Sequence, residues 1–171
     1  LLRAELMVFD GEFDKAESLL KELQAIEPAN EEIYVQQASI FSKKDKHQQA
    51  IDALKIALLY TDDEADILAM IGMEYLFLDN FDEARLNFAK CLEVDFDDYS
   101  SLYNVIYCFD MQSQHAEAIE YLNEYIDKDP YSEVAWHQLG RQYFILENYT
   151  EAEIDRMGMW IVHERDYKFT Y

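Results

Sequence analysis

The sequence predicts an all-α fold of stacked antiparallel helix hairpins, and three observations predict it. Alanine recurs at a strict 34-residue spacing along almost the whole chain. Only 4 Gly and 2 Pro occur among the 171 residues, too few for a protein of many tight turns. Half of the residues are hydrophobic, with 13 Tyr and 10 Phe among them, which is enough material for a continuous core.

The 34-residue period is shared by several columns of residues. The alanine column consists of Ala16, Ala50, Ala84, Ala118 and Ala152. Four residues later come Leu20, Leu54, Phe88 and Leu122. Nine residues before the alanines come Met7, Phe41, Tyr75, Phe109 and Tyr143, and three residues before them come Phe13, His47, Phe81, His115 and Tyr149. Self-similarity of this kind indicates repeats that bury their apolar faces only by stacking on one another.

The hydrophobic pattern within each 34-residue repeat predicts two amphipathic helices of about 14 residues. First helices are expected near 1–10, 31–44, 65–78, 99–112 and 133–146, and second helices near 13–26, 47–60, 81–94, 115–128 and 149–162. Close approach of the two helices requires small residues, which the alanine column supplies on the second helix. On the first helix they are Ala4, Ala38, Gly72 and Gly140. Pro28 and Pro130 mark ends of second helices, because proline cannot continue the hydrogen-bond ladder.

Several of these residues also form a known pattern. Trp136, Leu139, Gly140 and Tyr143 fit the signature W-x2-L-G-x2-Y, and Gly72 with Tyr75, then Ala84 with Phe88, fit it again. The segments 79–84 and 147–152 have the residues of a turn that enters a second helix. On these residues the chain resembles the tetratricopeptide repeat (TPR) family over positions 1–154.

The resemblance implies a right-handed superhelical solenoid of about five 34-residue repeats. These would lie near 1–30, 31–64, 65–98, 99–132 and 133–166, within a single domain over 1–171. Because the chain begins inside a first helix, we expect it to be part of a longer protein. The last repeat departs from the pattern: Arg156 stands in a Leu and Phe column, and the segment 157–162 has poor amphipathic spacing. We interpret it as an atypical terminal repeat.

The charge of the chain limits its partners. Fourteen Lys and Arg against 36 Asp and Glu give −22 at pH 7. This field repels nucleic acid and anionic membrane surfaces, and no apolar run is long enough for membrane insertion. A basic or neutral partner suits this field better, and we expect the ligand to be a basic or aromatic-rich protein segment. The alternative is that the acidity serves only solubility.

No motif of catalysis or of cofactor binding is found. The chain has no P-loop, no dinucleotide glycine motif and no His-Glu-x-x-His zinc motif, so we expect no enzyme activity, no cofactor and no metal. His47 and His115 share a column with aromatic residues, so packing accounts for them. Cys91 and Cys108 lie in apolar stretches and are expected as reduced core thiols of a cytoplasmic protein, although a bridge between them stays open.

The candidate site follows from the family resemblance, because peptides lie against the first helices of TPR arrays. Among the first-helix residues outside the packing columns, the candidates for the peptide-binding groove are Met70, Met73, Phe77, Tyr103, Asn104, Tyr107, Met111, His137, Gln138 and Arg141. Met adapts its shape, and Tyr offers apolar area with a polar tip. Asn104 and Gln138 would bind the backbone of an extended peptide. The alternative is that several of these residues pack against neighbouring helices.

The sequence therefore predicts a non-catalytic protein–protein interaction scaffold whose concave groove binds a peptide or an extended segment of a partner. The basic clamp with which some TPR proteins hold a C-terminal carboxylate is missing at the comparable positions. The alternative function is a structural repeat array that acts through self-association or within a larger assembly, which leaves a homo-oligomer open.

Overall fold

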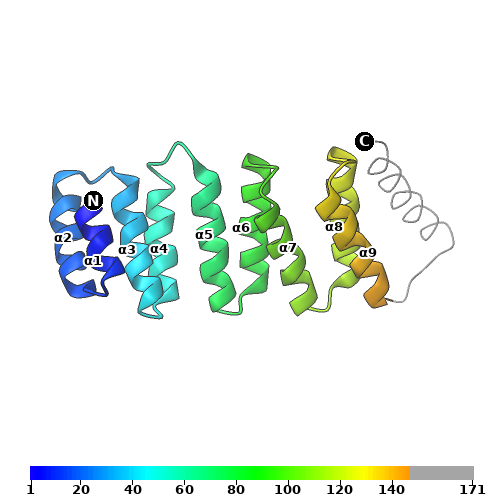
Figure 1. The fold of residues 1–171 in the computed structure, drawn as a ribbon, viewed down its shortest axis with the longest axis horizontal. Helices are drawn as coiled ribbons and strands as arrows, with labels where there is room; N and C mark the ends of the chain where they lie inside the picture. The colour runs from blue at the N-terminus through cyan, green and yellow to red at the C-terminus, as the bar shows by residue number, and fades with distance from the viewer. Residues whose placement is uncertain (147–171) are drawn as a thin grey trace, which may run out of the picture. The chain divides into compact units, whose positions relative to one another are not determined.

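A computed structural model describes residues 1–146 and shows an all-α helical repeat solenoid, as the sequence predicts (Figure 1). The first helices of the hairpins are α1 (Leu2–Phe9), α3 (Glu31–Lys43), α5 (Glu64–Phe77), α7 (Tyr99–Met111) and α9 (Glu133–Leu146). The second helices are α2 (Phe13–Ile26), α4 (His47–Ala57), α6 (Phe81–Val94) and α8 (His115–Lys128). The helix expected near 149–162 and the atypical segment 157–162 lie outside the described residues.

Two compact units divide the chain. Unit 1 is Leu1–Cys108, and unit 2 is Phe109–Tyr171. In unit 1 the packing follows chain order, since each helix from α1 to α6 packs against the next. In unit 2, α8 packs against α9. A single domain over the whole chain stays a prediction.

The first four alanines of the column lie at the centres of their hairpins. Ala16, Ala50, Ala84 and Ala118 are 0% exposed. The Leu and Phe residues four positions later are buried beside them. On the facing helix, a Cβ atom added to Gly72 would lie 2.8 Å from the ring of Phe88. The prediction that small residues permit this close approach is confirmed.

The turns inside the first four hairpins, all within residues 1–146, share one geometry that repeats every 34 residues. Gly11, Asp45, Asp79 and Ser113 all have a left-handed backbone, with φ between 54° and 78°. In the second of these turns the Asp45 N–H donates to the Ser42 carbonyl and the Lys46 N–H to the Phe41 carbonyl. The same two hydrogen bonds occur in the other three turns. This is the Schellman motif, which satisfies the last carbonyls of a helix and sets the direction in which the chain leaves it.

One helix is shorter than expected. The second helix near 47–60 ends at Ala57, because the next residues tighten into a narrower turn. There the Leu59 N–H donates to the Ile56 carbonyl and the Tyr60 N–H to the Ala57 carbonyl, three residues back instead of four. Tyr60 then stacks on Tyr34 of α3, with ring centroids 5.9 Å apart.

Candidate functional site

Exposed apolar side chains gather on α5 in unit 1. Met70, Met73 and Phe77 follow one another at helical spacing and are 41 to 59% exposed. Most helices of soluble proteins bury their large apolar side chains, so a row of such side chains at the surface requires an explanation. All three belong to the predicted site, and the structure places them at the surface of α5.

The neighbouring first helix continues the apolar surface. Tyr103 and Tyr107 of α7 are one helical turn apart and nearly half exposed. Asn104 is half-buried, and its Nδ2 atom lies 3.9 Å from Sδ of Met73, which joins the two helices. We call Met70, Met73, Phe77, Tyr103, Asn104 and Tyr107 the α5–α7 patch. The structure thus brings six of the ten predicted residues together in unit 1.

The rings of the patch are supported by residues that begin the second helices. His47, the first residue of α4, stacks on Phe77 with ring centroids 4.8 Å apart and an interplanar angle of 16°. Phe81, the first residue of α6, meets Tyr107 edge-on, with centroids 6.5 Å apart. His47 and Phe81 occupy the same column, so the support is a repeated feature of the hairpins.

A buried polar pair holds the first of these supports. His47 Nδ1 lies 2.8 Å from Oε2 of Glu74, and the two side chains are only 16% and 10% exposed. A packing role was expected for His47, and the stack on Phe77 is such a contact, whereas the bond to Glu74 was not expected. The signal was present: the positions 34 residues before and after Glu74 are apolar Ile40 and Cys108, so a carboxylate there needs a partner.

The other four predicted residues lie in unit 2, and one differs from expectation. Met111, His137 and Arg141 are exposed. Gln138 is 6% exposed, and its Oε1 accepts from Nη1 of Arg141 at 3.4 Å. The expectation that Gln138 presents its amide at the surface is therefore wrong, because Arg141 lies against it.

Arg141 is also engaged within unit 2. Its Nη1 atom lies 2.6 Å from Oδ2 of Asp110, and Nε2 of Gln142 donates to the other oxygen of Asp110 at 2.9 Å. Nδ1 of His115, in the same column as His47, lies 2.9 Å from Oε1 of Gln142. This network pairs the positive charge of Arg141 within the protein.

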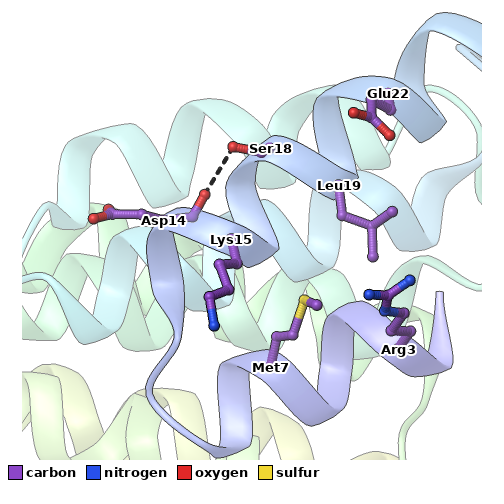
Figure 2. A pocket seen from close by; sticks show the side chains of 7 residues that line it. All are labelled: Arg3, Met7, Asp14, Lys15, Ser18, Leu19 and Glu22. Atoms are coloured by element: carbon purple, nitrogen blue, oxygen red, sulfur yellow. Dashed lines mark hydrogen bonds between the residues drawn. The ribbon is translucent and has the colours of Figure 1, made fainter.

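A separate hollow of about 510 Å³ lies on the first hairpin, away from the α5–α7 patch (Figure 2). It is lined by Arg3, Met7, Asp14, Lys15, Ser18, Leu19 and Glu22. Figure 2 shows Arg3 and Met7 on α1 facing Lys15 and Leu19 on α2. The lining mixes both charges with only two apolar side chains, so it offers less to an apolar ligand than the patch does.

Neither cysteine belongs to the patch. Both are buried and neither forms a disulfide, and burial raises the pKa of the Cys91 thiol and of the Cys108 thiol to about 11. Such thiols are poor nucleophiles at neutral pH. Within residues 1–146 no His, Cys, Asp or Glu side chains cluster as metal ligands would. Within the same range no helix has the length and apolar character needed to cross a membrane.

Comparison with known proteins places part of the chain in a sequence family. Residues 69–133, which include all of the α5–α7 patch, match the family model described as tetratricopeptide repeat. A comparison with curated protein sequences finds no match.

Solved structures share the arrangement of helices. MamA superposes with a TM-score of 0.66 at 18% identity, covering 98% of this chain and 97% of that chain. YrrB, described as a TPR protein with an unusual peptide-binding site, gives 0.63 at 18% identity, covering 95% and 88%. PilF from Pseudomonas aeruginosa gives 0.61 at 14% identity, covering 92% and 73%. At these identities the likeness shows the fold alone.

Proposed function

We propose that the chain, whose residues 69–133 match the tetratricopeptide repeat family, is a non-catalytic scaffold which holds a partner protein on the α5–α7 patch. The observation that carries the proposal is the row of exposed apolar residues on α5 and α7. Its rings are already supported by His47 and Phe81. A surface ordered before binding loses less entropy when it takes a ligand, so it binds more tightly.

The proposed ligand is an extended segment of the partner with basic and aromatic or aliphatic side chains. Apolar side chains of the ligand would cover Met73 and Tyr107, since Met and Tyr are common in adaptable binding surfaces. Basic residues suit a protein whose net charge is −22. The description of YrrB as a peptide binder adds support from a neighbour of the same fold. A reducing compartment such as the cytoplasm suits the two unpaired thiols.

The test begins with random 12-residue peptides displayed on phage and selected on the wild-type protein. The selected peptides are then labelled, and their affinities are measured by fluorescence anisotropy for the wild type and for the Met73→Glu/Tyr107→Glu variant. We expect the variant to lose at least about tenfold in affinity, the loss typical of a central contact residue. Circular dichroism must first show that the variant keeps its helices.

A matched control places the same charges elsewhere on unit 1. Leu59 and Leu86 are exposed and lie outside the patch, so Leu59→Glu/Leu86→Glu is expected to bind the peptides like the wild type. Equal loss in both variants, or no loss in the patch variant, would remove the α5–α7 patch as the binding site.

A further inference from the structure

The backbone fixes where the His47 side chain lies. Helix α3 ends at Lys43, Asp45 takes the left-handed conformation with φ of 56°, and α4 begins two residues later. The Schellman hydrogen bonds of this turn allow few other paths for the chain. This rigid connection therefore fixes the position of His47 beside α5.

His47 then makes two contacts on the same side of α5. Glu74 and Phe77 are three residues apart, so their side chains are neighbours on the helix surface. The His47 ring bonds to the carboxylate of Glu74 and stacks on the ring of Phe77. A hydrogen bond to a largely buried carboxylate is stronger than one in water, so Glu74 fixes the plane of the imidazole. That plane in turn fixes the plane of Phe77.

Phe77 nevertheless remains open to solvent. Its side chain is 59% exposed although one side of the ring is stacked on His47. Phe77 is also the last residue of α5, at the negative end of the helix dipole. An aromatic face in this position attracts a cation.

Other rings of unit 1 already contact cations. Nζ of Lys44 lies 5.9 Å from the centre of the Phe13 ring, and Nζ of Lys55 lies 5.6 Å from that of Tyr75. Both contacts are made within the protein. The open face of Phe77 offers the same kind of contact to a partner. Among cationic side chains, the planar guanidinium of arginine stacks best on a fixed ring.

We propose that Phe77 binds an arginine side chain of the partner segment, and that His47 and Glu74 are positioning residues that hold the ring for it. The arginine would stack on the face of Phe77 opposite His47, and the segment that carries it would continue over Tyr103 and Tyr107. This inference rests on the proposed function of the α5–α7 patch, for which it specifies the ligand chemistry.

The first experiment titrates the intact chain with the probe acetyl-Gly-Arg-Gly-amide and follows the ring signals of Phe77 by NMR. Two further probes replace Arg by Lys, which keeps the charge, or by citrulline, which keeps the planar shape without the charge. We expect saturable shifts with the Arg probe, and affinities lower by about threefold or more for both replacements. Equal affinity for Arg and citrulline would overturn the role of charge, and equal affinity for Arg and Lys would overturn that of stacking.

The second experiment tests positioning. In His47→Ala the ring of Phe77 loses its support, so the Arg probe should bind at least about threefold more weakly while the Phe77 signals show increased ring motion. The chain itself supplies a rescue, because the equivalent pair one repeat earlier is Phe13 with Ile40, packed in one apolar cluster. The variant His47→Phe/Glu74→Ile restores a supporting ring and should recover the wild-type affinity.

His115→Ala is the matched control, because it removes the same column residue from unit 2 and should leave the Arg probe unaffected. A folded His47→Ala variant that binds the probe like the wild type would overturn the positioning role. The proposed function is judged separately by the selected peptides: if Met73→Glu/Tyr107→Glu leaves their binding intact while the Arg probe still shifts Phe77, the patch fails as the peptide site and the arginine contact stands.

Discussion

Gly72 of α5 lies directly against the aromatic ring of Phe88 on α6. A Cβ atom added to Gly72 would lie 2.8 to 2.9 Å from three carbons of that ring. One and two repeats earlier the same two positions hold Ala38 with Leu54 and Ala4 with Leu20. The smallest first-helix residue thus faces the largest second-helix residue. In these three hairpins the two positions are complementary in volume, which keeps the interiors close-packed.

Replacing Gly72 by Ala should destabilise the protein. The clash costs about 1 to 3 kcal/mol, and the better helix propensity of Ala returns about 1 kcal/mol, so a net loss of about 1 kcal/mol is expected. Urea unfolding followed by circular dichroism measures it. The double variant Gly72→Ala/Phe88→Leu copies the Ala38 and Leu54 pair and should regain most of the loss. A Gly72→Ala variant more stable than the wild type would contradict the contact.

The left-handed turn residues give a second prediction. Asp79 has φ of 54° and an exposed side chain, so Asp79→Gly should leave stability unchanged or raise it by up to about 1 kcal/mol. Asp79→Val should lower stability by about 1 to 3 kcal/mol, because β-branched residues resist this conformation. Thermal unfolding of both variants distinguishes them, and a tolerated Val would mean that the turn is not fixed.

The hydrogen bonds of Asp110 predict that two substitutions in unit 2 differ in their effect on the free energy of unfolding. Asp110→Ala leaves the buried amide of Gln142 without its acceptor and should cost about 1 to 3 kcal/mol. Arg141→Ala should cost less than about 1 kcal/mol, because Arg141 is nearly half exposed and solvent replaces the lost ion pair. Chemical denaturation of the two variants gives the comparison, and equal losses would show that the ion pair, not the amide, dominates.

The buried thiols predict a dependence on pH. Burial raises the pKa of Cys91 and Cys108 to about 11 from an ordinary value of 9.0, so the folded protein keeps protons that the unfolded chain releases. The free energy of unfolding should therefore fall as the pH rises from about 9 to about 11. A Cys91→Ala/Cys108→Ala variant should lose stability less steeply over that window. At pH 8 both thiols should react with a disulfide reagent only as fast as the protein opens, and immediately in denaturant.

The helix positions were predictable because their signal is repeated. A 34-residue period fixes every helix start against several columns at once, and the observed starts lie within one residue of expectation for all nine described helices. The early end of α4 was not predictable, since it depends on local hydrogen bonds near Leu59 and not on a column. Of the four Schellman turns, only the one at Gly11 was indicated by its residue type. Glycine is usual at this position, but the other three turns have Asp45, Asp79 and Ser113 there.

The site was predictable only as far as it depends on helical spacing. The exposure of Met73 and Tyr107 follows from their places outside the packing columns. The burial of Gln138 does not, because it depends on the packing around that side chain, where Arg141 donates a hydrogen bond to its amide oxygen. The bond between His47 and Glu74 joins residues of two hairpins, and no pattern within one repeat reveals it.

Packing in chain order gives unit 1 contacts between residues close in sequence. Such a topology closes short loops, folds rapidly and opens one hairpin at a time, instead of unfolding all at once. A ligand lying across α5 and α7 would join two hairpins that otherwise open separately. Binding would then make the separate local opening of the two hairpins rarer, and amide hydrogen exchange would become slower in both helices together.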